Sequence, residues 1–172
     1  MHVVLVEPEI PQNTGNIART CAATGCTLDL VQPLGFRLED RYLKRAGLDY
    51  WPMVNVRVHA SFEDVLRENP DAPFFYATTK APRAYTQAAY PKDAFLVFGR
   101  ESRGLPENLL RRVYDRCVRI PMAAGARSLN LSNSVAIGVY EALPQAGLYR
   151  LQEAGNLPRP GARRAPRHDS PQ

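Results

Sequence analysis

Short apolar runs alternate with stretches of helical periodicity along most of this chain. The apolar runs predict strands at His2–Glu7, Leu28–Val31, Val54–Val58, Phe74–Thr78, Phe95–Phe98 and Val118–Ile120. Helical spacing and helix-starting residues predict helices over about Gly15–Thr24, Arg41–Ala46, Phe62–Glu68, Pro106–Val113 and Leu131–Leu143. This alternation is typical of an α/β fold, in which helices flank a mostly parallel sheet.

Several residues predict where these helices begin and end. The hydroxyl side chains of Thr14 and Ser61 are predicted to cap helix N-termini, and Gly25 is predicted to end a helix. Pro106 fits the first turn of a helix. The polar segment Lys80–Tyr90 predicts a long loop between two central strands, and loops of that length are often functional.

The composition divides the chain into one domain, residues 1–156, and a basic tail, residues 157–172. Proline, arginine and glycine dominate the tail, so we expect it to be disordered. Four arginines against one aspartate give the tail a charge of +3, out of a net charge of +5 for the chain. The remaining +2 is too small to establish a nucleic-acid partner by itself.

Cysteine spacing and hydropathy indicate the cellular compartment in which the protein is expected. Cys21, Cys26 and Cys117 form no C-x-x-C pair, so we expect buried, reduced thiols. No apolar stretch approaches the ~20 residues of a membrane span, and the N-terminus does not resemble a signal peptide. We therefore expect a cytoplasmic protein without a membrane segment. The histidines are scattered, so we expect no metal site and a structural role for His59.

Three segments combine glycine, amide, hydroxyl and charged side chains at predicted strand ends. They are Pro11–Arg19, Phe98–Pro106, and Ile120–Met122 followed by Ser128–Asn133. Ligands of open α/β sheets bind at such strand ends. Each segment alone could equally be structural: a strand–helix junction with a surface arginine, a charged turn, and a set of helix caps. The second segment is not a phosphate-binding loop, since Leu105 and Pro106 follow its second glycine.

Taken together, in this order and spacing, the three segments resemble the motifs of the SPOUT superfamily of RNA methyltransferases. Within it, they look most like the small tRNA wobble-position 2′-O-methyltransferases. The resemblance covers about residues 1–150 and includes Glu7–Pro11, Arg45–Tyr50 and Ala77–Lys80. Arg100 departs from the subgroup, which often has proline there, and Pro144 interrupts the usual end of the last helix.

The resemblance implies a C-terminal trefoil knot and a homodimer with composite active sites. It implies S-adenosyl-L-methionine as cofactor, bound by Ala77, Gly99, Ile120, Ser128 and Leu129. Gly99 is expected to leave room for that ligand. The matching catalytic positions are Arg19, supported by Asn13, with Glu101 and Asn130 nearby.

The implied reaction is methylation of the ribose 2′-oxygen of the wobble nucleotide, a cytidine or modified uridine at tRNA position 34. Because a guanidinium stays protonated in proteins, we expect Arg19 to stabilise the developing oxyanion, with Asn13 holding the guanidinium. The anticodon stem-loop would approach basic side chains, for which Arg41, Lys44, Arg45, Lys80 and Arg83 are candidates.

Two alternatives stay open. One is an rRNA 2′-O-methyltransferase of the same superfamily; the lack of a recognisable N-terminal RNA-binding domain favours the small tRNA type. The other is a non-catalytic RNA-binding protein that keeps the fold. A protein that only binds RNA would not need the full set Asn13, Arg19, Glu101, Ser128 and Asn130, which favours an enzyme.

Overall fold

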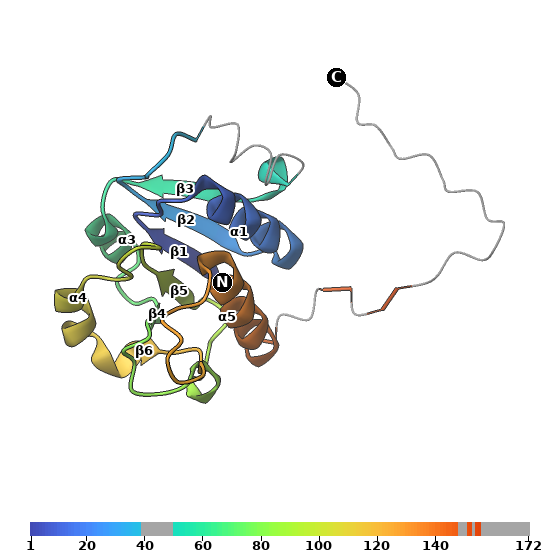
Figure 1. Ribbon diagram of the computed structural model, residues 1–172. Helices are drawn as coiled ribbons and strands as arrows, with labels where there is room; N and C mark the ends of the chain where they lie inside the picture. Colours follow the sequence, from blue (N-terminus) through green and yellow to red (C-terminus); the bar gives the residue numbers. More distant parts are fainter. Residues whose placement is uncertain (39–49, 148–150, 153, 156–172) are drawn as a thin grey trace, which may run out of the picture.

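The computed structural model describes residues 1–38, 50–147, 151–152 and 154–155, and in these ranges six strands form one sheet. The strands are β1 (His2–Val6), β2 (Thr27–Val31), β3 (Val56–His59), β4 (Phe74–Ala77), β5 (Phe95–Phe98) and β6 (Cys117–Val118). Their order is β3-β2-β1-β5-β4-β6, and every pair is parallel (Figure 1). All strands therefore end at the same edge of the sheet.

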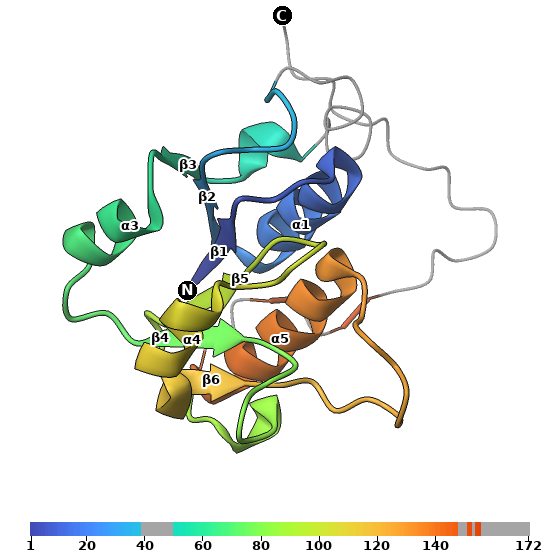
Figure 2. The same cartoon turned by 60° about the vertical axis from the view of Figure 1, so that its left-hand side comes forward.

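Helices cover both faces of this sheet. The helices are α1 (Pro11–Thr24), α3 (Phe62–Glu68), α4 (Glu107–Arg112) and α5 (Leu131–Gln145), with short 3-10 segments η1 (Trp51–Met53), η2 (Tyr85–Gln87) and η3 (Tyr114–Arg116). In Figure 2, α1 and α5 lie on one side of the strands, and α3 and α4 on the other. The prediction of a parallel sheet flanked by helices is confirmed. No described helix is long and apolar enough to cross a membrane.

Alternate side chains of the central strands supply two apolar clusters, one on each face. On β1, Val3 and Leu5 join the cluster beneath α1 and α5, and Val4 and Val6 join the cluster beneath α3 and α4. Burial on both faces explains why the strands are continuous apolar runs in the sequence. Further members of the clusters are Ile17, Leu28, Phe98, Val135 and Val139 on the first face, and Phe62, Phe74, Tyr76, Val97 and Leu110 on the second.

The three cysteines are buried and free, as expected. Burial raises the pKa of each thiol, so all three stay protonated and unreactive.

Helix α1 differs from its prediction at the N-terminus. It begins at Pro11 rather than about Gly15, and its N-cap is Ile10, which supplies no side-chain cap. Thr14 therefore lies inside the helix, where its hydroxyl is buried without a hydrogen-bond partner in the part of the chain that is described. Proline at the first helical position starts the helix early, because its ring fixes the required φ. The helix ends as predicted at Gly25, whose φ is 71°.

The C-terminal elements also differ in detail. Pro106 precedes α4 as its N-cap, and β6 covers two residues because Arg119 pairs instead with Ala84. The predicted loop Lys80–Tyr90 thus contains η2 and a bridge to the sheet edge. Pro144 does not interrupt α5, which runs through it to Gln145.

Other boundaries shift by one or two residues, as is usual at element ends. The helix expected at 41–46 and the tail from 157 lie outside the described residues.

Candidate active site

A cavity of about 580 Å³ lies at the carboxyl-terminal edge of the sheet. Its walls come from the loops that follow β1, β4, β5 and β6, together with the first turns of α1 and α5. Open parallel sheets bind ligands at this edge, and cofactor pockets commonly measure about 300–1,000 Å³. The cavity is therefore a candidate binding site in both position and size.

Eight of the nine residues that the sequence singled out meet in this cavity. The lining includes Asn13, Ala77, Gly99, Glu101, Ile120, Ser128, Leu129 and Asn130. These residues come from the first turn of α1, the end of β4 and the segments that follow β5 and β6, spread over more than 100 positions of the chain, so their convergence is a property of the fold.

The Glu101 side chain accepts three hydrogen bonds at the cavity. Its Oε2 accepts the backbone N–H of Glu9 at 2.8 Å, and its Oε1 accepts the N–H of Ile10 at 3.2 Å. The side-chain amide of Asn13 also donates to Oε1, at 3.0 Å. The first turn of α1 contains no acidic residue, so Glu101 places a negative charge at that helix N-terminus from a distant loop.

Asn13 connects the loop after β5 with the start of α5. While its Nδ2 donates to Glu101, its Oδ1 accepts from Nδ2 of Asn130 at 2.9 Å. Asn13 is buried, and both ends of its amide have partners. Its orientation is therefore fixed before any ligand binds.

Asn130 has two functions, one of which is structural. Its Oδ1 caps α5 by accepting from the backbone N–H groups of Ser132 and Asn133, at 2.9 and 3.3 Å. Its remaining amide nitrogen reaches Asn13. The capping alternative from the sequence is correct for Asn130, and the bond to Asn13 is additional to it.

Gly99 is required by its own loop, which corrects the expectation that it mainly makes room for a ligand. A Cβ at position 99 would overlap the backbone of Gly104 and Leu105. These atoms are close because Gly104 N–H donates to the Arg100 carbonyl at 2.8 Å and closes the loop. A side chain at position 99 would meet the protein before it met any ligand.

Arg19 is the one predicted site residue that does not reach the cavity of its own chain. It is exposed on α1, and its guanidinium lies 4.8 Å from the centre of the Tyr50 ring. The expectation that Asn13 holds this guanidinium is wrong within one chain, because the Asn13 amide is already bonded to Glu101 and Asn130.

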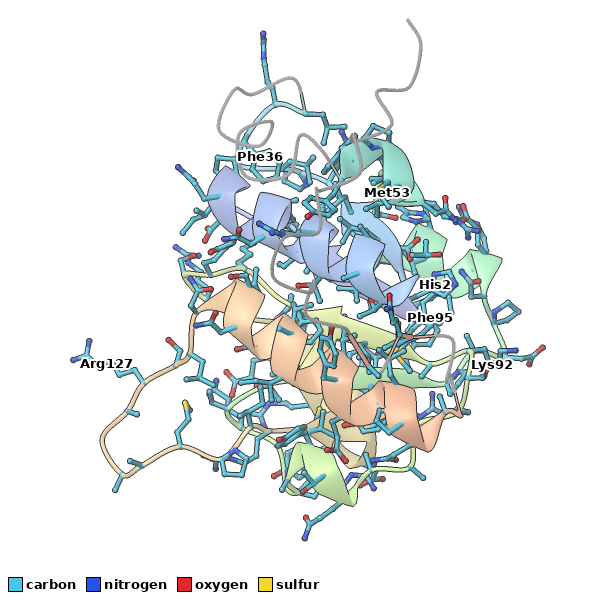
Figure 3. The ribbon with its side chains drawn as sticks, turned by 90° about the vertical axis from the view of Figure 1, so that its right-hand side faces the viewer. His2, Phe36, Met53, Lys92, Phe95 and Arg127 are labelled. Carbon is cyan, nitrogen blue, oxygen red and sulfur yellow. The ribbon has the colours of Figure 1, made fainter. Side chains whose placement is uncertain are left out.

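The cavity lining contains more positive than negative charge. Its cations are Lys80, Arg100, Arg103 and Arg127, against the single carboxylate of Glu101. Arg100 pairs with Glu7 and Lys80 with Glu107, whereas Arg103 and Arg127 have no ion pair within the described ranges. Figure 3 shows Arg127 projecting from the loop between β6 and α5. The lining therefore suits a polyanion at its mouth.

The structure adds residues that the sequence interpretation missed. Ile10, Thr78, Leu105 and Met122 contribute to the lining, and Glu9 contacts the loop of Glu101 from outside it. Glu9 lies within the family-like segment Glu7–Pro11, which was the only sequence signal for it.

Of the five predicted RNA-contacting cations, Lys80 lines the cavity, Arg83 is half-buried, and the other three lie outside the described residues.

Comparison with known proteins identifies the family. The model of the SpoU rRNA Methylase family matches residues 1–140. A Geobacillus stearothermophilus protein, provisionally named tRNA (cytidine(34)-2′-O)-methyltransferase, is 51% identical over 154 residues, which cover 88% of this chain and 98% of that protein.

Solved structures agree. One, described as giving insight into 2-OH methylation of C/U34 on tRNA, is 46% identical with a TM-score of 0.81, covering 85% of this chain and 95% of that one. An AdoMet-bound rRNA methyltransferase from Sinorhizobium meliloti is 28% identical with a TM-score of 0.75, covering 83% and 55%. With its fold, its cavity and these matches in agreement, the chain belongs to the SpoU methylase family.

Proposed function

We propose that this protein transfers a methyl group from S-adenosyl-L-methionine to the ribose 2′-oxygen of the wobble nucleotide of tRNA. The observation that supports this most is the convergence of all three motif segments on one cavity. The names of relatives that match nearly end to end support tRNA position 34 as the substrate, cytidine or modified uridine. Three free cysteines and a tRNA substrate are consistent with a cytoplasmic location.

The cavity residues fit the cofactor. Ala77 and Ser128 have small side chains that let a ligand approach the backbone, Gly99 contributes backbone to the lining, and Ile120 and Leu129 offer apolar contact. The cavity volume suits a ligand of nucleoside size. When bound, the cofactor supplies an electrophilic methyl group on sulfur.

The protein must orient the ribose and stabilise its 2′-oxygen as the proton leaves. Glu101 already accepts three hydrogen bonds, so it has little capacity left to take that proton and instead fixes the loop after β1. A guanidinium stays protonated and can donate to a developing oxyanion. We assign this role to Arg19.

For Arg19 to reach a cavity, a second subunit is needed. We infer a homodimer in which Arg19 of one protomer completes the cavity of the other. An exposed stripe on α5 supports this: Ile137, Tyr140 and Pro144 follow at helical spacing beside α1, with Tyr140 54% exposed. An unpartnered apolar stripe of this kind suits a two-fold interface.

We also infer the C-terminal knot that the resemblance implies. After β6 the chain pairs with the segment between β4 and β5 and then crosses to α5, which packs on α1 and β5. We infer that the chain passes through the paired loop at this crossing and so forms the knot.

Complementation between two inactive variants tests the proposal. Arg19→Ala and Glu101→Gln are each expected to lower methyl transfer to position 34 of a tRNA anticodon stem-loop. For Arg19→Ala the loss should be ~10²–10³-fold in turnover, the range for one preorganised donor to an oxyanion. Mixed and allowed to exchange subunits, the variants should regain about a quarter of wild-type activity, since half the dimers are mixed and each has one intact site.

Controls separate the parts of the proposal. Each variant refolded alone must stay inactive, and its mass in solution should be that of a dimer. Failure to complement, with dimers intact, would place Arg19 and Glu101 in the same subunit's site. Methyl groups found in rRNA fragments but not at position 34 would contradict the substrate.

A further inference from the structure

Two carboxylates join the loop after β1 to the loop after β5, each reaching across to the other loop. Glu101, in the β5 loop, accepts the backbone N–H groups of Glu9 and Ile10. Glu9, in the β1 loop, accepts from Ser102: the backbone N–H donates to Oε2 at 2.9 Å and the hydroxyl donates to Oε1 at 2.7 Å. We call this set the reciprocal clamp.

Both oxygens of Glu9 are occupied by a single neighbour, Ser102, the residue after Glu101. The side-chain and backbone hydrogen bonds from Ser102 lower the pKa of Glu9, so its carboxylate is charged at neutral pH. Glu9 is not part of the cavity lining, whereas Glu101 and Ser102 are. It is thus placed to act on the site through Ser102 and not on a ligand directly.

The backbone of Glu9 is fixed from a third direction. Gly35, in the loop after β2, lies so close that a Cβ at position 35 would come within 2.7 Å of Glu9 Cα. The Gly35 N–H also donates to the carbonyl of Pro8 at 2.9 Å. The β1 loop is therefore a fixed support. From it the Glu9 side chain restrains the Glu101 loop at Ser102, next to the hydrogen bonds of Glu101 and the Arg100–Glu7 ion pair.

We propose that Glu9 is a positioning residue, which through Ser102 holds the Glu101 loop in the conformation that methyl transfer requires. The inference rests on the proposed function, because it assumes that the Glu101–Asn13–Asn130 network orients the reacting groups. Small displacements at such a network reduce the rate more than they reduce binding, since alignment matters most in the transition state.

The test measures kcat, the KM for tRNA and the Kd for S-adenosyl-L-methionine of the full-length protein. Glu9→Ala removes both bonds from Ser102, and kcat is expected to fall about 10–100-fold. KM and Kd should change by less than about threefold. Glu9→Gln keeps an acceptor for the Ser102 N–H and should recover part of the rate. Ser102→Ala removes the hydroxyl bond alone and should fall between wild type and Glu9→Ala.

The double variant Glu9→Ala/Ser102→Ala distinguishes a clamp from two independent effects. Because both residues act through the same bonds, its kcat should equal that of Glu9→Ala rather than the product of the two losses. Glu63→Ala removes an exposed carboxylate on α3, away from the clamp, and should leave kcat unchanged. All assays are run well below the melting temperature of each variant.

Different outcomes overturn different statements. If Glu101→Ala retains wild-type turnover, the proposed role of the Glu101 network fails. If Glu101→Ala is inactive while Glu9→Ala, Glu9→Gln and Ser102→Ala keep wild-type kcat, the clamp proposal alone is wrong. A lowered melting temperature with unchanged kcat would make Glu9 a purely structural residue, which also overturns it.

Discussion

Gly99 and Gly104 stand at the two ends of the loop between β5 and α4, and each is required for a different reason. At Gly99 there is no room, because a Cβ would overlap the backbone at the other end of the loop. At Gly104 there is room, but φ is +69°, a conformation that L side chains rarely adopt. The loop that presents Glu101 therefore depends on close approach at one end and on backbone handedness at the other.

This difference predicts unequal effects of adding one methyl group. Gly99→Ala must displace the loop and should lower the affinity for S-adenosyl-L-methionine by at least about tenfold, together with the melting temperature. Gly104→Ala should cost about 1–2 kcal/mol of stability and leave affinity nearly unchanged. Calorimetric binding and thermal unfolding of both variants check this; equal affinities for the two variants would contradict it.

The sequence identified the residues of the site better than their functions. Gly99 and Asn130 were both singled out, yet one supports its own loop and the other also caps α5. Residue type and spacing indicate that a position is constrained. They do not say whether the constraint comes from a ligand or from backbone that is distant in sequence.

Among the elements, α1 illustrates a boundary that local sequence could not predict. Its cap was sought in a nearby hydroxyl, Thr14, but the N-terminus is held by Glu101, 91 residues away from Ile10. The pattern of apolar residues predicted the strands and helices well, because burial of side chains on both faces of the sheet produces that pattern. The start of α1, the short β6 and the bridge between Ala84 and Arg119 depend on contacts between segments far apart in sequence.

A polar contact links β1, β2 and β3 beneath α3. Asp29, 1% exposed, accepts from His2 Nδ1 at 2.7 Å and from His59 Nε2 at 2.8 Å. His2 also stacks on Phe95, next to it in Figure 3. His59 is thus structural, as expected. Burial raises the pKa of Asp29, but the hydrogen bonds from the two histidines outweigh it, so the pKa lies below its ordinary value.

This contact predicts a pH-dependent contribution to stability. A depressed carboxylate pKa stabilises the fold above the unfolded-state value of about 3.9, and this contribution is lost as pH falls through the folded pKa. Asp29→Asn should lower the free energy of unfolding by about 1–3 kcal/mol at neutral pH, with the difference shrinking below about pH 4. Urea unfolding at one protein concentration measures it.

The control for Asp29 is Asp71→Asn, an exposed aspartate, which should change the free energy of unfolding by less than about 0.5 kcal/mol. A deficit for Asp29→Asn that stays the same at acidic pH would mean that packing, and not charge, is lost.

At the scale of the whole molecule, the proposed composite site would account for what the single chain leaves incomplete. The loops at the carboxyl edge supply the cavity and its network, while Arg19 is exposed on α1 with its guanidinium over the Tyr50 ring. Sequence can identify Arg19 as a motif residue but cannot say which subunit's cavity it enters, because both arrangements place it on the same helix. How the two subunits assemble decides which cavity Arg19 enters.

The cavity mouth also predicts how RNA binds. Arg103 and Arg127 are exposed cations of the lining without ion pairs in the described residues, and they come from loops on two different strands. Arg103 and Arg127 form a rim at the cavity mouth. A ribose that enters the cavity brings its flanking phosphates to this rim. Each of the two arginines is therefore expected to neutralise about one phosphate of the anticodon loop.

Removal of either cation should weaken RNA binding in a salt-dependent manner. Arg103→Ala and Arg127→Ala should each reduce the slope of log K against log salt by about 0.7–0.9, because one fewer counterion is released. Affinity for S-adenosyl-L-methionine without RNA should stay unchanged. The matched control is Arg67→Ala, which removes the same charge from α3, where Arg67 pairs with Asp64. Fluorescence titrations of an anticodon stem-loop over a salt series measure all three variants. If the slopes of the rim variants equal that of Arg67→Ala, the RNA backbone does not cross this rim.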